Sequence, residues 1–155
     1  MTNRVAASVL LTLAAATAVA FRPGVDVRIC RTLEEAVPAK TGAVLLVFFS
    51  TDCPVCYDGL FESRFTVDKG GWPVAVVGVY AGPAAELRSF LEKYAWTLPV
   101  VLDRQRLLAR KYHVDMVPDR VLVVAGELCY RDDQRVDPNR RRKELERCLT
   151  KIFSR

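Results

Sequence analysis

Cys53 and Cys56 are the residues whose type and spacing point most directly to chemistry. Two cysteines separated by two residues can form a reversible disulfide or supply half of a zinc site. A four-ligand zinc site needs further ligands at a matching spacing, and the sequence has neither a second CxxC motif nor a pair of histidines. Haem attachment needs a histidine after the second cysteine, where Tyr57 stands. The pattern therefore favours a redox-active pair.

The residues around this pair predict how its first sulfur becomes reactive. Residues 43–49 form an unbroken apolar run, which is typical of a central strand buried on both faces. Pro54 suits the first turn of a helix, because the N–H that it lacks would have no partner there. Cys53 would then lie at a helix N-terminus, which stabilises a thiolate. We expect Cys53 to attack a substrate disulfide and Cys56 to resolve the mixed disulfide.

Hydrophobic periodicity predicts the elements that position the pair. Strands are expected at 25–29, 43–49, 74–80, 99–102, 121–125 and 128–131, with a turn at Gly126 and Glu127. Helices are expected at 33–37, from Pro54 to the glycines at 70 and 71, from Pro83 to Tyr94, at 103–111 and at 138–153. The order is βαβαβ, then an inserted α-extended-α segment, then ββα, which indicates parallel crossovers followed by an antiparallel hairpin.

Two of these helices have faces that can be assigned from their apolar residues. We expect Leu60, Phe61 and Phe65 to form the buried side of the helix after the cysteine pair. In the last helix we expect an apolar stripe, which comprises Leu145, Cys148, Leu149, Ile152 and Phe153. The basic run 140–143 is expected on the opposite, solvated face.

Three segments resemble proteins of the thioredoxin fold. Residues 48–56, FFSTDCPVC, resemble their active-site strand and turn, and residues 112–118, YHVDMVP, resemble the loop that carries their cis-proline. Residues 98–103 are similar to the insert of the TlpA-like and redoxin branch. The resemblance implies an α/β three-layer sandwich, with a central mixed sheet, helices on both faces and an extra α-β insert before the cis-proline loop. It also implies that Pro118 is cis beside the sulfurs, and that the Val117 backbone pairs with a substrate peptide.

Three positions depart from the pattern of those relatives. Val47 stands where thioredoxins have a buried Asp, Gly59 where many TlpA-like reductases have a Glu, and Asp52 where an aromatic residue usually precedes the first cysteine. The sequence therefore leaves the direction of electron flow open. Asp52 and Asp58 are candidate proton relays, although a solvated acid is the ordinary interpretation of each.

The remaining cysteines and the single histidine have ordinary structural interpretations. We expect Cys129 and Cys148 to be two separate buried thiols, although a disulfide between them is sterically conceivable. Cys30 is expected to pack at the end of the first strand. His113 is expected on the surface, and a copper-binding module that uses Cys53, Cys56 and His113 is the alternative.

Residues 1–20 have the features of a secretory signal. Arg4 precedes an apolar stretch, and Ala18-Val19-Ala20 has the small-x-small form of a cleavage site. We predict cleavage after Ala20, with an uncleaved membrane anchor as the alternative. Residues 21–155 would form one domain in the periplasm or another extracytoplasmic, oxidising compartment.

The expected partners are proteins. The net charge of +5 is spread over mixed acidic and basic residues, which concerns solubility and does not indicate nucleic-acid binding. We predict a monomer without cofactor or metal that exchanges disulfides with disulfide or dithiol clients and is recharged by a membrane or soluble redox partner.

A thiol peroxidase is a second enzymatic hypothesis. Redoxins of that type have Pro seven and Thr or Ser three residues before the reactive cysteine; Ser50 matches and Leu46 does not. An inactive interaction module is the last alternative.

Overall fold

The computed structural model describes residues 26–154, so the predicted signal at 1–20 lies outside the described residues. The strands are β1 (Ile29–Cys30), β2 (Ala43–Phe49), β3 (Ala75–Tyr80), β4 (Val100–Leu102), β5 (Asp119–Val124) and β6 (Glu127–Arg131). The helices are α1 (Leu33–Ala36), α2 (Cys56–Gly70), α3 (Ala84–Lys93), α4 (Leu107–Lys111) and α5 (Pro138–Phe153). The element order is the predicted one. Between residues 26 and 154, no helix is long and apolar enough to cross a membrane.

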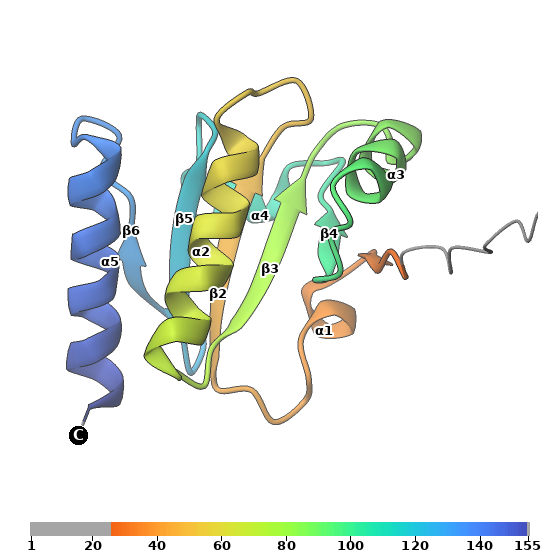
Figure 1. The fold of residues 1–155 in the computed structure, drawn as a ribbon. Coiled ribbons are helices and arrows are strands. Elements are labelled where there is room, and N and C mark those ends of the chain that lie inside the picture. The colour runs from red at the N-terminus through yellow and green to blue at the C-terminus, as the bar shows by residue number, and fades with distance from the viewer. Residues whose placement is uncertain (1–25, 155) are drawn as a thin grey trace, which may run out of the picture.

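The six strands form one mixed sheet in the order β1-β4-β3-β2-β5-β6. Neighbours from β1 to β2 are parallel, whereas β5 pairs antiparallel with both β2 and β6. The inserted strand β4 lies between β3 and β1. In Figure 1, α2 lies in front of β2, and α5 stands beside β6.

Two hydrophobic clusters cover the two faces of this sheet. Residues of α2, α3 and α5 pack in one cluster, and residues of α1 and α4 pack in the other. All seven residues of β2 are buried, and their side chains alternate between the two clusters. This position explains why the strand is apolar throughout, since neither of its faces meets water. The predicted three-layer arrangement is confirmed.

The helix after the cysteine pair differs from the prediction in its start and its buried face. It begins at Cys56, so Pro54 lies in the preceding turn. Leu60 is fully buried as expected, but Phe65 is 66% exposed and Phe61 is 39% exposed. The expectation for these two phenylalanines was wrong, because the helical repeat that buries Cys56 and Leu60 continues through Ser63 and Val67 instead. Phe61 instead packs against aromatic rings at the border with α3.

The C-terminal hairpin also differs from the prediction. Its two-residue turn consists of Ala125 and Gly126, both with positive φ (50° and 88°), whereas the sequence suggested Gly126 and Glu127. A two-residue loop with two positive φ values matches the right-handed twist of the flanking strands. β5 begins at Asp119, directly after Pro118 and two residues earlier than predicted.

A β-bulge interrupts the outer strand β6. Leu122 pairs with Tyr130 and the next residue, Val123, pairs with Leu128, so Cys129 is the extra residue on β6. Cys129 is exposed and Cys148 is half-buried. The expectation of two buried thiols was therefore wrong for Cys129, because it lies in β6, an edge strand of the sheet.

Candidate redox site

Cys53 and Cys56 are joined by a disulfide, with their Cα atoms 5.4 Å apart. The backbone N–H of Cys56 donates to the carbonyl oxygen of Cys53 across 3.1 Å, so the two residues close a tight turn at the start of α2. Cys56 is fully buried, whereas Cys53 is partly exposed. Only the Cys53 sulfur is therefore open to a partner from solvent.

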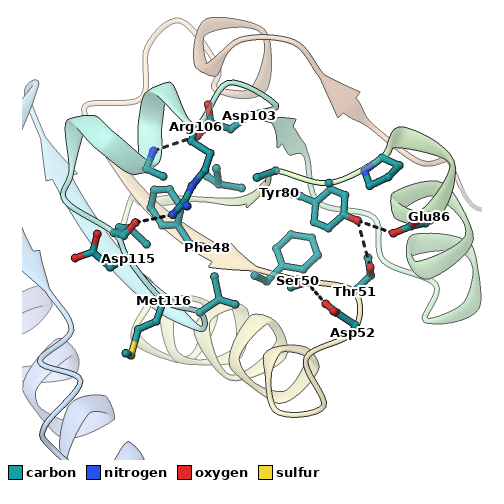
Figure 2. Close-up of a pocket in the computed structure, with 18 residues that line it drawn as sticks. Phe48, Ser50, Thr51, Asp52, Tyr80, Glu86, Asp103, Arg106, Asp115 and Met116 are labelled. Atoms are coloured by element: carbon teal, nitrogen blue, oxygen red, sulfur yellow. Dashed lines mark hydrogen bonds between the residues drawn. The ribbon is translucent and has the colours of Figure 1, made fainter.

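The residues before Cys53 are anchored to β3 and α3 (Figure 2). The Thr51 hydroxyl lies 3.2 Å from the hydroxyl of Tyr80, which donates to the Glu86 carboxylate across 3.2 Å. The ring of Tyr80 packs against Phe49, with the ring centroids 5.6 Å apart. Burial raises the pKa of Tyr80, so its hydroxyl stays protonated as a donor. These contacts fix the turn that presents the cysteines.

The two acids predicted as candidate proton relays are both exposed. The Ser50 hydroxyl donates to the Asp52 carboxylate, and this hydrogen bond, with a second from the backbone, lowers the pKa of Asp52. Such a carboxylate keeps its negative charge at neutral pH and is a poor proton donor. Asp58 lies on the first turn of α2. A relay through either acid stays a prediction.

The peptide bond between Val117 and Pro118 is cis, as the resemblance implied. Pro118 packs against α2 at Gly59, where an added Cβ would be 3.5 Å from the Pro118 Cβ. The Pro118 carbonyl oxygen accepts a hydrogen bond of 3.0 Å from the Gln134 side chain. Val117 is 38% exposed and Val55, between the two cysteines, is 59% exposed. The disulfide is thus bordered by exposed apolar side chains.

A buried ionic cluster of Arg120, Asp132, Glu62 and Arg141 lies beside Pro118. Arg120 donates two hydrogen bonds to Asp132, of 2.9 and 3.1 Å, and both side chains are almost fully buried. Glu62 lies 3.7 Å from Arg120, and Arg141 lies 4.0 Å from Asp132. Arg141 therefore belongs to this cluster and not to the solvated face predicted for the basic run 140–143.

Two hollows flank the cis-proline loop. One, of about 320 Å³, is bounded by Val55, Gly59 and Pro118 and has Arg120 and Asp132 in its wall. The other, of about 480 Å³, lies between the turn at 50–52, the end of β3 and the loop at 114–117. Figure 2 shows this second hollow. A peptide that pairs with the backbone of Val117 would have room for side chains on both sides of the loop.

Asp119 follows the cis-proline and is completely buried. Its side chain faces away from α2, in register with Phe48, and Arg131 lies 3.4 Å from one of its oxygens. Neither oxygen has a hydrogen-bond partner among residues 26–154. Burial raises the pKa of Asp119 to about 6 despite the nearby Arg131.

Sequence reasoning missed these charged residues because it began the strand at 121 and left 119 and 120 in a loop. A signal was present in the hairpin itself. When Leu122 opposes Tyr130, Arg120 opposes Asp132, and the Asp132 N–H donates to the Arg120 carbonyl oxygen across 3.0 Å. Opposite charges at facing positions of a hairpin indicate a cross-strand ion pair.

The structure does not group His113 with the cysteine pair. His113 is exposed after α4, with a φ of 55°. Within the described part of the chain, no three side chains of His, Cys, Asp or Glu gather in a metal-binding arrangement. The copper-binding alternative therefore gains no support from the geometry.

The CxxC disulfide, the cis-proline and the order of the strands together define a redox protein of the thioredoxin fold. The sequence matches the AhpC/TSA family over residues 29–139, and the chain belongs to this family. The predicted redoxin resemblance is thereby confirmed. Among curated protein sequences, none matches this chain.

Solved structures share the fold at low sequence identity. A putative thiol:disulfide interchange protein DsbE from Chlorobium tepidum is 20% identical, with a TM-score of 0.61 over 72% of this chain and 80% of that chain. The exposed lipoprotein thioredoxin Etrx1 of Streptococcus pneumoniae is 18% identical, with a TM-score of 0.59 over 72% and 86%. A secreted Mycobacterium tuberculosis disulfide oxidoreductase is 18% identical, with a TM-score of 0.54 over 72% and 82%. They confirm the thioredoxin-like fold.

Proposed function

We propose that this protein is a thiol-disulfide oxidoreductase that exchanges disulfides with client proteins through Cys53 and Cys56. The observation that carries the proposal is the unequal exposure of the two sulfurs. Cys53 is partly exposed to solvent, and Cys56 is fully buried at the start of α2. This arrangement suits an attacking thiol and a resolving thiol.

The exchange proceeds in two steps. The Cys53 thiolate attacks one sulfur of a client disulfide, which forms a mixed disulfide and releases one client thiolate. The Cys56 thiolate then attacks the Cys53 sulfur, which closes the Cys53–Cys56 disulfide and releases the second client thiolate. The client gains two electrons and the protein loses two. Run in reverse, the same steps oxidise a dithiol client.

The cis-proline loop is the surface on which we place the client. The exposed Val117 would offer its backbone for short strand-like pairing, and it lines the same hollow as the turn at 50–52 that precedes Cys53. The hollows on the two sides of the loop receive neighbouring client side chains. Binding therefore relies on main-chain pairing, with apolar contacts to Val55 and Met116.

We infer that the protein works outside the cytoplasm as a monomer. Support comes from the signal-like residues 1–20 and from the relatives of the same fold that are described as secreted or as an exposed lipoprotein. In an oxidising compartment the pair needs a membrane or soluble redox partner to reset it. The thiol:disulfide interchange proteins of this fold suggest protein partners.

The test is catalysed exchange with a model protein disulfide in the presence of dithiothreitol. Wild type is expected to accelerate reduction, and Cys53→Ser is expected to abolish the acceleration. Cys56→Ser is expected to accumulate a mixed disulfide between Cys53 and the client, because the resolving thiol is missing. Cys30→Ser is the control and should behave as wild type. Equal rates for wild type and Cys53→Ser would refute the proposal.

A thiol peroxidase is the second candidate, because redoxins of the peroxidase type share this fold and Ser50 matches their pattern. Two observations weigh against it. The Ser50 hydroxyl is engaged with Asp52, and Leu46 is fully buried in β2 where the peroxidase pattern has Pro. We therefore expect hydrogen peroxide to be consumed no faster by wild type than by Cys53→Ser. Peroxide turnover that depends on Cys53 would make the thiol peroxidase the favoured function.

A further inference from the structure

Two cysteines outside the redox site meet at the contact between β6 and α5. The Cys148 thiol donates a hydrogen bond to the carbonyl oxygen of Cys129, with the sulfur 3.9 Å from that oxygen, although 19 positions separate the two residues. Cys30, by contrast, is buried alone in β1. The chain thus brings two thiol-bearing residues into direct contact.

Cys129 is the bulged residue of β6, and its main chain lies against α5. A bulge inserts an extra residue into one strand, and here Cys129 lies between the pairs Leu122–Tyr130 and Val123–Leu128. Leu122 packs in the cluster that contains α2 and α5, and the Tyr130 hydroxyl donates to the Arg141 carbonyl oxygen in α5 across 3.0 Å. The Cys129 carbonyl oxygen, next to Tyr130 in the chain, contacts the same helix through the Cys148 thiol. The two thiols also interact electrostatically: burial raises the pKa of Cys148, and the Cys129 thiol raises it further.

We propose that Cys129 and Cys148 form a second disulfide, which fastens α5 to the bulged edge strand. A disulfide requires Cα atoms about 4.4–6.8 Å apart, and the Cys148 sulfur already touches the Cys129 main chain. Cys129 is exposed and can meet an oxidant, whereas Cys148 is half-buried beside it. The pair therefore has an accessible first thiol and a sheltered second one.

The oxidation is a thiol-disulfide exchange with a small disulfide such as glutathione disulfide. The Cys129 thiolate attacks one glutathione sulfur, which forms a mixed disulfide and releases one glutathione thiolate. The Cys148 thiolate then attacks the Cys129 sulfur and releases the second glutathione thiolate. The two released thiolates take up the two protons that the cysteines lost. Two protein thiols are oxidised and one glutathione disulfide is reduced.

The cross-link would brace the segment that supports the cis-proline loop. The chain between Cys129 and Cys148 includes Asp132 of the buried ionic cluster and Gln134, which donates to the Pro118 carbonyl oxygen. Closing this segment into a loop reduces the freedom of the unfolded chain. The second disulfide would thus stabilise the segment that supports the redox site, and it would take no part in the disulfide exchange at Cys53 and Cys56.

The test counts free thiols in the purified protein after equilibration with glutathione disulfide. The protein is alkylated under denaturing, non-reducing conditions, and its mass is measured. One alkylated thiol, that of Cys30, is expected. Trypsin should then release a linked pair of peptides, Val121–Arg131 and Cys148–Lys151. Three alkylated thiols, persistent glutathione on Cys129 or Cys148, or a link between two chains would overturn the proposal.

Matched variants keep the result independent of the proposed function. Cys129→Ser should show two alkylated thiols, and Cys30→Ser should show none. Cys148→Ser should show one alkylated thiol and one glutathione retained on Cys129, because the resolving thiol is missing. The double variant Cys53→Ser with Cys56→Ser cannot exchange disulfides through the redox site, yet it should give the same linked peptides. Loss of the link in that variant, with the protein folded by circular dichroism, would contradict the proposal while leaving the proposed function untouched.

Discussion

Asp119 is a buried carboxylate directly after the cis-proline, and its raised pKa makes the stability of the protein depend on pH. The folded-state pKa of about 6 lies above the ordinary value of 3.8, so folding favours the protonated form. The resulting stabilisation is complete below about pH 4 and is lost as the pH rises through about 6.

Replacing Asp119 with Asn should remove this dependence. Between pH 4 and pH 7, the free energy of unfolding of wild type should fall relative to that of Asp119→Asn by about 2 to 3 kcal/mol, the equivalent of the pKa difference. Urea unfolding at both pH values measures it. Parallel pH profiles for the two proteins would show that Asp119 titrates normally.

The Arg120–Asp132 pair gives a second prediction at the scale of single residues. Removing Arg120 leaves the Asp132 carboxylate buried with its main ionic partner gone, so Arg120→Met should cost about 3–5 kcal/mol of unfolding free energy. Arg135 and Asp133 offer a matched control, because they form the same two-bond pair with the Arg135 side chain 90% exposed. Arg135→Met should cost no more than about 1 kcal/mol. Equal losses would mean that burial does not set the cost.

At the scale of elements, a glycine inside α2 and the glycine that caps its C-terminus should respond in opposite ways to alanine. Gly59 lies inside the helix, and an added Cβ would make an ordinary contact with Pro118. Gly59→Ala should therefore stabilise the protein by about 0.5–1 kcal/mol. Gly71 ends the helix with a φ of 63°, so Gly71→Ala should destabilise it by about 1 kcal/mol. Urea unfolding measures both. Stabilisation by both changes would contradict the assigned backbone at Gly71.

Much of the fold could be predicted from the sequence, because its elements follow from local patterns. The buried run of β2 and the apolar stripe of α5 are both as expected, because the residues of that stripe pack in the cluster that contains α2. The order of elements followed in the same way, whereas the cis bond before Pro118 was implied by the resemblance to proteins of the thioredoxin fold.

The parts that could not be predicted depend on contacts between elements. Phe65 is apolar yet exposed. The buried face of α2 is the one that packs against the sheet and α3, and Phe65 lies on another face of the helix. Asp119 and Arg120 looked like loop residues, but the strand extends through them because β2 pairs with both. The redox pair itself was predicted from two residues. The buried ionic cluster beside Pro118 could be predicted only from the register of the hairpin.

At the scale of the whole molecule, the described residues form one sheet with two covered faces, and the predicted signal remains to be tested. If residues 1–20 direct export and are removed, the mature protein begins at Phe21. Expression of the full chain in an exporting bacterium, followed by mass measurement of the extracytoplasmic product, should give a chain of residues 21–155. A full-length product confined to the membrane fraction would favour the uncleaved anchor.

The bulge at Cys129 also affects how separate molecules meet. An open sheet has two outer strands whose unpaired backbone groups can recruit strands from other molecules. Here one outer strand, β1, has only two residues, and the other, β6, is broken in its middle by the bulge. Neither presents a long, regular ladder of donors and acceptors. If the protein pairs with client backbones at Val117 as proposed, these edges protect it from pairing with its own copies along the rims of its sheet.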